Sequence, residues 1–283
     1  MEPVCYFNGA IVPLSAARVS VCDIGLLRGF GIYQAVRSYG PRPFMLAEHL
    51  GSLRRSAKAM NLTVPASDAQ IDRAIGALIE KNIAAGKDAV IRIILTGGEA
   101  TDALEYDLSR PTFYILCDVL QPLSATLLLQ GARLIAHEYL RPFPESKTTN
   151  YVEAVLLQPE RIHAGALDIL YTWQGNALEC ATSNFFIVKD GSIMTPRNNV
   201  LLGVTRSVVI DLAREEFPLE ERDVSVEEMH AADEAFLTAS FKEVVPIVEV
   251  GGKPIGNGTP GLVTKRIMAL FSDLTRPHEA RGS

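Results

Sequence analysis

The sequence has few cysteines, no long apolar run and little net charge, and each shortage excludes a class of protein. Its four cysteines show no CxxC spacing and no Cys/His pairing, so we predict no metal site and a protein of the reducing cytoplasm. No apolar run approaches the roughly 18 to 20 residues of a membrane span, and no signal peptide pattern opens the chain. A formal charge of −6, with scattered lysines and arginines, argues against nucleic acid and anionic membranes as partners. The expected ligand is therefore a small molecule.

What the sequence does contain is enough apolar material for two cores. Hydrophobic residues make up 48% of the 283 residues, which favours a folded protein over a disordered one. From Cys117 to Ser124 the composition changes to Asp, Gln, Pro and Ser, which is typical of a linker between domains. We therefore predict a small α/β domain over residues 1–118, a linker over 119–125 and a larger domain over 126–283.

Turn and capping signals divide the first half into short elements. The Asn8-Gly9 pair predicts a hairpin over residues 4–12, because both residues tolerate the positive φ of a tight turn. Gly40-Pro41 predicts a second hairpin, and a capping box of Ser67 with Gln70 begins a helix that Gly86 is expected to close. Apolar spacing predicts a further helix over 50–60 and strands over 31–39, 44–46, 89–96 and 112–117. The last two strands are almost wholly apolar and should be buried on both faces.

The second half is richer in strands, with Asp190-Gly191 and Gly251-Gly252 as turns. The predicted strands are residues 132–137, 168–173, 183–188 and 234–238, and the predicted helices are 151–164 (bent at Pro159), 206–217 and 261–274. The mixture of helices and strands in both halves predicts an α+β protein.

Four features could carry chemistry, and each also has a purely structural explanation. Lys147 lies between a strand and a helix and could be an ordinary surface lysine. Glu179 ends a strand and could be an edge residue. Gly203 to Thr205 open a helix whose free N–H groups could bind phosphate, although capping by Thr205 explains the same pattern. Arg92 stands alone in an apolar strand, where a buried guanidinium must find an anion, either a ligand or a structural carboxylate.

Taken together, these features resemble the class IV (fold type IV) aminotransferases, which use pyridoxal 5′-phosphate (PLP). This group includes D-amino-acid and branched-chain aminotransferases and aminodeoxychorismate lyase. The resemblance covers nearly the whole chain and lies in the order of its blocks, any one of which would be weak. The matching blocks are Asp23 to Tyr33, Glu48-His49-Leu50, Ser56-Ala57-Lys58, Lys147 to Tyr151, Glu179 to Val188, Gly203 to Arg206 and Glu243 to Pro246.

The resemblance implies two domains, a small α/β N-terminal domain and a larger C-terminal pseudo-barrel that binds PLP, in a homodimer. It makes Lys147 the lysine that forms a Schiff base with PLP and later moves a proton between Cα of the substrate and C4′ of the cofactor. Glu179 would face the pyridine nitrogen and strengthen the electron sink. The remaining cofactor contacts implied are Tyr151 to the ring hydroxyl, and Val204, Thr205, Ser240 and Phe241 on the phosphate side.

The sequence departs from the family pattern on its phosphate side. The family usually has an arginine where this chain has Ser52, and that arginine grips the phosphate. Ser52 can still donate one hydrogen bond, and Arg55, one helical turn further on, could reach the phosphate from the same face. We therefore expect PLP to bind less tightly than is usual for the family. The acidic residue usual after Tyr33 is Gln34 here, and the glycine usual after Glu179 is Cys180.

The substrate is less closely defined by the resemblance. The carboxylate trap of typical D-amino-acid members is absent, because Gly97-Gly98-Glu99 follows the strand that ends at Thr96. Arg28 and Arg92 resemble a less common D-amino-acid subgroup, in which Arg28 would come from the partner subunit. Two arginines in apolar surroundings would suit dicarboxylates, so we predict D-alanine or D-glutamate as donor and 2-oxoglutarate or pyruvate as acceptor.

Three alternatives stay open. Tyr33 and Arg37 match an arrangement of branched-chain members, which would make the protein an L-branched-chain aminotransferase. Aminodeoxychorismate lyase shares the cofactor frame and eliminates pyruvate. A cofactor-poor binding or regulatory protein is the third, with Ser52 as its one supporting feature.

Overall fold

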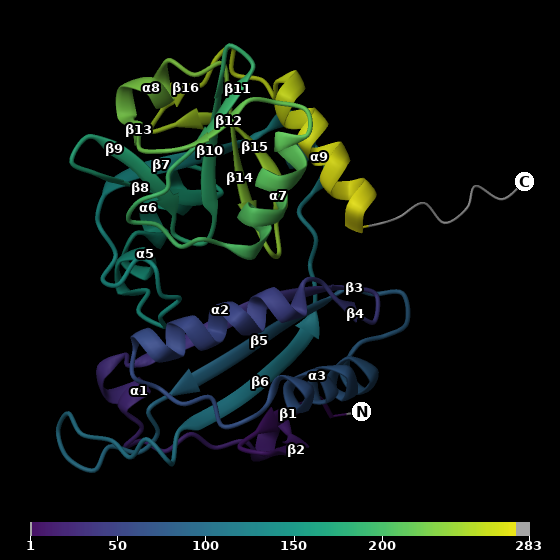
Figure 1. Ribbon diagram of the computed structural model, residues 1–283, viewed down its shortest axis with the longest axis vertical. Helices are drawn as coiled ribbons and strands as arrows, with labels where there is room; N and C mark the ends of the chain where they lie inside the picture. Colours follow the sequence, from purple (N-terminus) through teal and green to yellow (C-terminus); the bar gives the residue numbers. More distant parts are fainter. Residues whose placement is uncertain (1, 276–283) are drawn as a thin grey trace, which may run out of the picture. The chain divides into compact units, whose positions relative to one another are not determined.

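A computed structural model describes residues 2–275, and the chain forms two compact units (Figure 1). Unit 1 comprises Met1–Gln121 and Ser146–Asn150, and unit 2 comprises Pro122–Glu145 and Tyr151–Ser283. The predicted domains meet at a single linker over 119–125. In the structure the chain leaves unit 1 after Gln121, returns to it for Ser146–Asn150, and then stays in unit 2. The returning segment contains Lys147, so this lysine belongs to the N-terminal unit although it follows a strand of the other one.

Unit 1 is built on a six-stranded sheet with the order β2-β1-β6-β5-β3-β4. Its strands are β1 (Val4–Phe7), β2 (Ala10–Pro13), β3 (Gly31–Tyr39), β4 (Arg42–Pro43), β5 (Ala89–Thr96) and β6 (Thr112–Val119). Its helices are α1 (Ile24–Arg28), α2 (Leu46–Ala59) and α3 (Asp68–Asn82), with a short 3-10 turn at Leu14–Ala16. All the strand pairs of this sheet are antiparallel.

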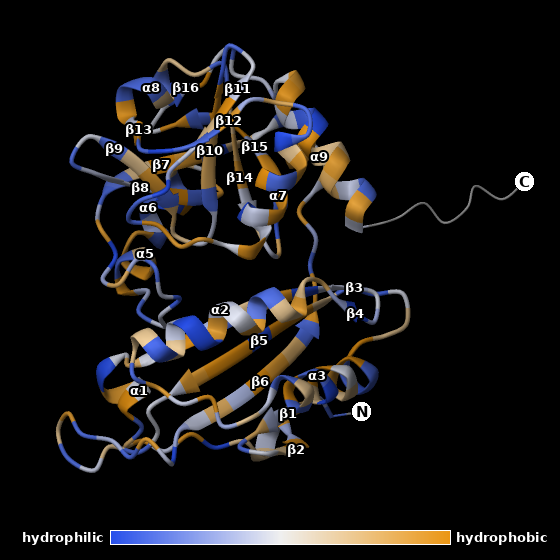
Figure 2. Ribbon diagram, viewed as in Figure 1, coloured by the Kyte–Doolittle hydropathy of each residue, from blue (hydrophilic) through white to orange (hydrophobic). Residues whose placement is uncertain are grey.

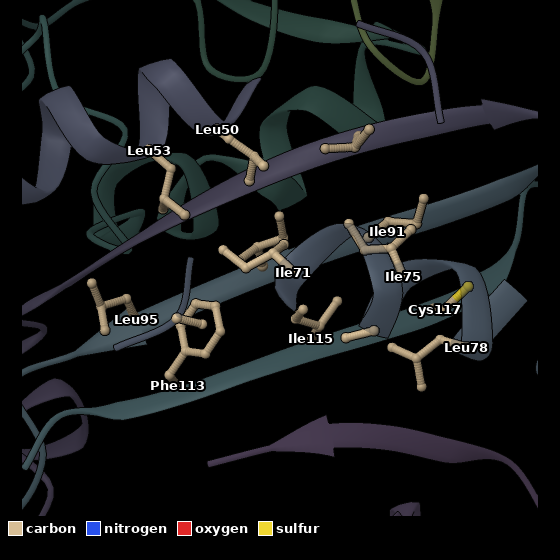
Figure 3. Packing of buried hydrophobic residues seen from close by; sticks show 14 of the residues in the cluster. Leu50, Leu53, Ile71, Ile75, Leu78, Ile91, Leu95, Phe113, Ile115 and Cys117 are labelled. Carbon is tan, nitrogen blue, oxygen red and sulfur yellow. The ribbon is translucent and has the colours of Figure 1, made fainter. Parts of the chain in front are cut away.

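The core of unit 1 lies between α2, α3 and one face of this sheet (Figure 3). Leu50 and Leu53 of α2 and Ile75 of α3 pack against Ile91 of β5 and Ile115 of β6, all of them almost fully buried. Alternation along the strands puts every second residue on this face, and β5 is mostly orange in Figure 2. Burial of such aliphatic side chains stabilises the unit by roughly 1.5–3 kcal/mol for each large one.

Local sequence signals set several boundaries in unit 1. The hairpin β1–β2 turns at Asn8 and Gly9, which have φ of 44° and 98°. Helix α3 begins with the predicted capping box, in which Ser67 accepts a hydrogen bond from the Gln70 N–H and Gln70 caps the Ser67 N–H.

Three expectations for unit 1 were wrong. Residues 44–46 are not a strand, because Met45 adopts φ of 49° and α2 begins at Leu46. The helix α3 ends at Asn82, since Ile83 is already extended, and Gly86 lies in the following turn. Strands β5 and β6 are not buried on both faces. On the face opposite the helices, Arg92 and Asp118 are exposed.

Unit 2 is built on a ten-stranded mixed sheet that curls (Figure 1). Its path is β12-β11-β10-β14-β15-β7-β8-β9-β13, and β16 pairs with β15. The strands are β7 (Ala132–Glu138), β8 (Asp168–Trp173), β9 (Asn176–Cys180), β10 (Asn184–Lys189), β11 (Ser192–Thr195), β12 (Leu219–Glu221), β13 (Val224–Ser225), β14 (Glu234–Ala239), β15 (Glu243–Val250) and β16 (Lys253–Pro254). The helices are α4 (Ala125–Gln130), α5 (Val152–Leu156), α6 (Gln158–His163), α7 (Val204–Arg214), α8 (Val226–His230) and α9 (Leu262–Thr275).

The predicted helix over 151–164 is two short helices in the structure. α5 ends at Leu156, and α6 starts at Gln158 with Pro159 in its first turn. A proline is tolerated there because the first N–H groups of a helix have no intrahelical acceptor. A new helix therefore begins at Gln158, just before the proline at which we expected a bend.

Candidate functional site

Lys147 lies on a short extended segment that adds to the edge of β3. The Tyr33 N–H donates to the Lys147 carbonyl at 2.9 Å, and the Thr149 N–H donates to the Gly31 carbonyl at 2.9 Å. Ile32 and Thr148 are bridge partners between these two bonds. The Lys147 N–H itself donates to Oγ of Ser56 on α2, at 3.2 Å. The backbone of the lysine is therefore fixed from two sides by unit 1.

The amine of Lys147 lies over an aromatic ring. Its Nζ is 4.7 Å from the centroid of the Tyr33 ring, a distance at which the ring face attracts a cation. No ion pair joins Lys147 to a carboxylate in the part of the chain that the structure describes. The sequence identified both residues as site candidates, and the structure brings them together.

Beneath α2 lies a buried cluster of uncharged polar side chains, here called the neutral cluster: Gln34, His49 and Ser52. Nε2 of Gln34 donates to Oγ of Ser52 at 2.9 Å, and Oε1 of Gln34 lies 3.3 Å from Nδ1 of His49. All three side chains are at least nine-tenths buried. The two departures from the family pattern at positions 34 and 52 are thus bonded to each other, which the sequence did not reveal.

Burial keeps His49 neutral. It lowers the pKa of this imidazole from 6.5 to about 3, and the nearby positive charge of Lys147 adds to the effect. The neutral cluster therefore carries no charge at physiological pH, because amide and hydroxyl groups do not titrate there.

The two arginines that follow Ser52 on α2 have different surroundings. Arg54 is held by Asp68, to which its Nε donates at 2.8 Å, and by the Ala66 carbonyl. Arg55 is exposed, and its Nη1 lies 3.5 Å from the point where a Cβ on Gly51 would be. Ser52 is buried and Arg55 is exposed, so the two side chains have different surroundings although they are one helical turn apart. The guanidinium of Arg55 lies back along the helix over Gly51.

The expectation of a buried guanidinium at Arg92 was also wrong. Its side chain is 44% exposed and pairs with Asp118, which is 60% exposed, at 2.9 Å. The cause is the alternation of the strand, which puts Arg92 on the face of β5 that α2 and α3 do not cover. A structural carboxylate, the simpler of the two explanations from the sequence, provides its counter-charge.

Arg28 ends the short helix α1 and is exposed. Its Nη1 donates to the carbonyl of its neighbour Leu27 at 2.9 Å. The helix is anchored by the fully buried Asp23, which accepts hydrogen bonds from the Gly25 N–H and from the hydroxyls of Thr96 and Thr112. The anchor ties α1 to the ends of β5 and β6, so it fixes where the helix that carries Arg28 begins.

In unit 2, Glu179 sits in a hydrogen-bond network at the end of β9. Its Oε1 accepts from both Nε and Nη2 of Arg141, the first at 2.9 Å, and Nη2 also donates to the Pro144 carbonyl. Its Oε2 accepts from the Leu201 N–H at 3.1 Å. The two charged side chains are only 7% and 11% exposed. Such a pair is held rigidly, because both carboxylate oxygens are bonded.

Asn184 links Glu179 to the start of α7. Its Nδ2 donates to the Leu201 carbonyl at 2.6 Å and lies 3.5 Å from Oε2 of Glu179. A Cβ on Gly203 would be 2.4 Å from Oδ1 of Asn184, so any larger residue would require Asn184 to move. Asn184 lies in the block from Glu179 to Val188, but its role was not evident from the sequence.

The start of α7 offers unused hydrogen-bond donors. The N-cap residue of this helix is Gly203, which has no side chain. Among the described residues, no side-chain cap therefore accepts a hydrogen bond from the N–H groups of Val204 and Thr205. The hydroxyl of Thr238 is buried and has no hydrogen-bond partner within residues 2–275, and Thr238 is the strand partner of Asn184. The expected capping by Thr205 is absent. An anionic group could bind here, because the uncapped N–H groups and the unpaired buried hydroxyl would donate hydrogen bonds to it.

Ser240 and Phe241 form the turn between β14 and β15, and the next residue fastens this turn. Nζ of Lys242 donates to Oδ2 of Asp168 at 2.5 Å and to the hydroxyls of Thr182 and Ser183. Burial disfavours the charge on Asp168, but the ammonium and hydroxyl groups outweigh that effect and lower its pKa. All three N–H donors of Lys242 are therefore used in holding the turn.

The two remaining positions of unit 2 that the sequence singled out are Tyr151 and Cys180. Tyr151 lies at the start of α5 and packs against the cluster that contains Ile169 and Tyr171. Cys180, next to Glu179, is buried, and burial and the charge of Asp168 raise the pKa of its thiol well above the usual range. A thiol that stays protonated is a poor nucleophile, so Cys180 is a packing residue.

Sequence reasoning missed Arg141, Asn184 and Lys242. Arg141 had one usable signal, since it is a single charged residue in the otherwise uncharged run from Tyr139 to Pro144. The partners of all three lie at other positions along the chain, so no local pattern marks them.

Unit 1 also has a cavity that lies apart from the predicted site residues. A cavity of about 600 Å³ in unit 1 is lined by residues such as Phe7, Arg18, Glu99 and Arg110, and none of the predicted site residues lines it. Within residues 2–275 no group of three or more His, Cys, Asp and Glu side chains is placed to hold a metal ion. No helix in this range has the length and apolar character to cross a lipid bilayer.

Comparison with known proteins shows the family. Residues 31–250 match the model of the amino-transferase class IV family, and the chain belongs to this family. A protein of Methanocaldococcus jannaschii named putative branched-chain-amino-acid aminotransferase is 33% identical over 279 residues, which is 95% of each chain. The D-alanine aminotransferase of Bacillus licheniformis is 28% identical over 276 residues, covering 94% of this chain and 95% of the relative.

Solved structures agree with the sequence relatives. The crystal structure of the T.th. branched-chain amino acid aminotransferase with pyridoxamine 5′-phosphate has a TM-score of 0.88 and 26% identity, covering 99% of this chain and 96% of that one. The predicted fold type is confirmed, and the chain is an aminotransferase that uses the cofactor of its class, PLP. Which amino acid it uses is a separate question, because its relatives include both kinds of enzyme.

Proposed function

We propose that Lys147 is the residue that binds PLP covalently and moves the proton in transamination. The observation that carries this proposal is the placement of its amine, which is fixed through the edge of β3, lies over the Tyr33 ring and pairs with no carboxylate among residues 2–275. The donor set suits the cofactor, because unit 2 supplies a buried carboxylate at Glu179, uncapped N–H groups at α7 and an unpaired hydroxyl at Thr238.

Bound PLP supplies an electron sink for a negative charge at the α-carbon of the amino acid. Lys147 would take the proton from this α-carbon and return it at C4′. Glu179, fixed by Arg141, would keep a negative charge against the pyridine nitrogen and so hold the proton there. Tyr151 would bond the ring hydroxyl.

Each unit carries residues that we propose as phosphate contacts. In unit 2 these are Val204 and Thr205 at the start of α7, and the turn of Ser240 and Phe241 that Lys242 fastens. In unit 1 they are Ser52 and Arg55 on α2. The hydroxyl of Ser52 accepts from Gln34 and keeps its own proton available to donate.

For the substrate we propose L-branched-chain amino acids first and D-amino acids second. The physical case for a dicarboxylate required two arginines in apolar surroundings, but Arg92 is exposed and paired with Asp118, and Arg28 is exposed. The relative with 33% identity is named a branched-chain enzyme. Arg37 does not decide the question, because it is buried and bound to Asp88. D-amino acids remain the second choice. Arg28 donates to a backbone carbonyl, and the relatives include D-alanine aminotransferases.

A half-reaction panel tests the substrate proposal. Holoenzyme is mixed with single D- and L-amino acids, and loss of the visible absorbance of the bound cofactor is recorded. We expect loss with L-leucine and L-isoleucine. Loss with D-alanine or D-glutamate alone would overturn the first choice in favour of the second. Pyruvate release from a chorismate-derived amine without an acceptor would identify a lyase.

We further propose that the enzyme is a homodimer in which a second copy covers α1. Three large apolar side chains near Arg28 are exposed: Val21, Leu26 and Leu27. An exposed apolar patch next to a charged residue is typical of a protein interface. Light scattering should give twice the mass of the 30.8 kDa chain, and Leu26→Glu should reduce it to the mass of a monomer. A monomeric wild-type enzyme would contradict this.

A further inference from the structure

The buried face of α2 is polar but carries no charge. His49, Ser52 and Ser56 are spaced three and four residues apart, so they form one stripe along the helix, beside the apolar stripe of Leu50 and Leu53. Within the stripe, the neutral cluster bonds to itself through Gln34. The imidazole is neutral because its pKa is about 3. The helix therefore presents imidazole and hydroxyl groups, bonded to the Gln34 amide of β3, where the resemblance implies a guanidinium.

The cationic side chains of α2 would bind a phosphate less strongly than that guanidinium. Arg54 is engaged by Asp68. Arg55 and Lys58 are exposed, and an exposed, flexible cation gains little from an anion because water screens the pair and ordering the side chain opposes it. A buried, bidentate guanidinium on a phosphate is among the strongest hydrogen-bonded contacts in proteins.

The donors in unit 2 are also neutral. The start of α7 offers backbone N–H groups, and Thr205 and Thr238 offer hydroxyls. Arg206, the next residue of this helix, is committed elsewhere, since its Nη1 bonds Glu221 at 2.9 Å and its Nη2 bonds the Pro196 carbonyl. The N-terminus of a helix typically stabilises an anion less than a full positive charge does.

We propose that, with no fixed cation from α2 at the phosphate, this enzyme retains its cofactor mainly through the bond to Lys147, and releases the aminated form, pyridoxamine 5′-phosphate, between the two halves of its reaction. The proposal rests on the proposed function of Lys147. In the first half, one water is consumed, the amino group passes to the cofactor, the carbon skeleton leaves as a 2-oxo acid, and Lys147 becomes a free amine. From then on, only the neutral donors and the exposed Arg55 hold the phosphate.

The test measures retained cofactor in place of activity. PLP-loaded enzyme is incubated with the amino acid that is active in the half-reaction panel, without a 2-oxo acid, and is then desalted. Cofactor in the protein and small-molecule fractions is quantified after acid denaturation. We expect the untreated enzyme to keep its cofactor and the treated enzyme to lose most of it. Equal retention before and after treatment would overturn the proposal.

A double variant restores the family pattern. Gln34→Glu with Ser52→Arg introduces a guanidinium together with a carboxylate that can pair with it, whereas Ser52→Arg alone buries an unpaired charge. We expect the double variant to bind pyridoxamine 5′-phosphate on the order of tenfold or more tightly than the wild type, in a direct titration of the apoenzyme. Ala59→Arg, which adds the same charge at an exposed position of α2, is the matched control and should leave the affinity unchanged.

The outcomes separate the two proposals. If Lys147 has no covalent role, the untreated enzyme also loses its cofactor on desalting, and the proposed function fails first. If the untreated enzyme keeps the cofactor and the treated enzyme keeps it equally well, only the inference about α2 fails. Circular dichroism and the thermal midpoint of the double variant show whether it is folded. If the double variant is not folded, titration of pyridoxamine 5′-phosphate into the wild-type and Arg55→Gln apoenzymes still tests the proposal, because the proposal predicts weak binding by both proteins.

Discussion

Unit 2 buries the ion pairs Arg141–Glu179 and Lys242–Asp168, whereas unit 1 buries the uncharged Gln34, His49 and Ser52 beneath α2. Both arrangements satisfy their hydrogen bonds. They differ in what they can do to a bound group. The carboxylate of Glu179 is held by Arg141, so under the proposed function it would control the protonation of a bound group. The neutral cluster can only orient a partner by hydrogen bonds.

The neutral cluster fits the two departures from the family pattern that the resemblance implies at positions 34 and 52. A buried charge without a partner is destabilising, so an arginine and its acidic neighbour are best lost together. Gln34 and Ser52 are the two departures of this chain on the helix-covered side of the sheet, and they bond to each other at 2.9 Å. In the ion pairs of unit 2 both members are present.

Breaking the charged network of unit 2 should have the largest effect. Arg141→Met leaves Glu179 buried without its cation, so we expect the free energy of unfolding to fall by about 3–5 kcal/mol. Urea denaturation of the apoenzyme measures this. The matched control is Arg222→Met, which removes an arginine that is 39% exposed and paired with Glu220 and Glu228, and should cost about 1 kcal/mol or less. Adding Glu179→Gln to Arg141→Met should recover part of the loss, and no recovery would contradict a charged pair.

The neutral cluster of unit 1 should show itself in the pH dependence of stability. The pKa of His49 is about 3 in the folded protein and about 6.5 in an unfolded chain. Below about pH 6.5 the unfolded chain binds a proton that the folded protein does not, so stability falls as the pH falls, by about 1.4 kcal/mol per unit. Between about pH 6.5 and about pH 5 this amounts to about 2 kcal/mol.

His49→Gln removes the titrating group and keeps a polar side chain in the cluster. Urea denaturation at about pH 7 and about pH 5 should therefore show a smaller difference in the variant than in the wild type. An equal difference in both proteins would mean that His49 is charged, or already exposed, in the folded state.

Arg92 should give the smallest effect. Its exposed pair with Asp118 contributes less than about 1 kcal/mol to stability, and Arg92→Ala should leave KM for both D- and L-amino acids within about twofold of the wild type. A selective rise in KM for D-glutamate or 2-oxoglutarate would show that Arg92 binds substrate, and would restore the D-amino-acid prediction.

Much of the framework could be predicted from the sequence, because it depends on local signals. The strands β3, β5 and β8 have the predicted bounds, and the capping box of α3 and the turn at Asn8-Gly9 are as expected. The errors come from competing local effects. Met45 adopts a left-handed conformation where a strand was expected, and a new helix with Pro159 in its first turn begins where a bend was expected.

The site was harder to predict, since its contacts join distant positions. Gln34 with Ser52, Arg141 with Glu179 and Lys242 with Asp168 are each brought together only by the fold. The surroundings of Arg92 show the limit of apolar runs as evidence of burial. A charged residue within an apolar run can still be exposed, because a strand has two faces and the helices cover only one face of β5.

The most direct test is to fix the cofactor to the protein. PLP-loaded enzyme is reduced with borohydride, digested, and its peptides are mapped by mass spectrometry. The account predicts one phosphopyridoxyl group, on the peptide that contains Lys147, and none in Lys147→Ala. A label on another lysine, or full turnover by Lys147→Ala, would contradict it.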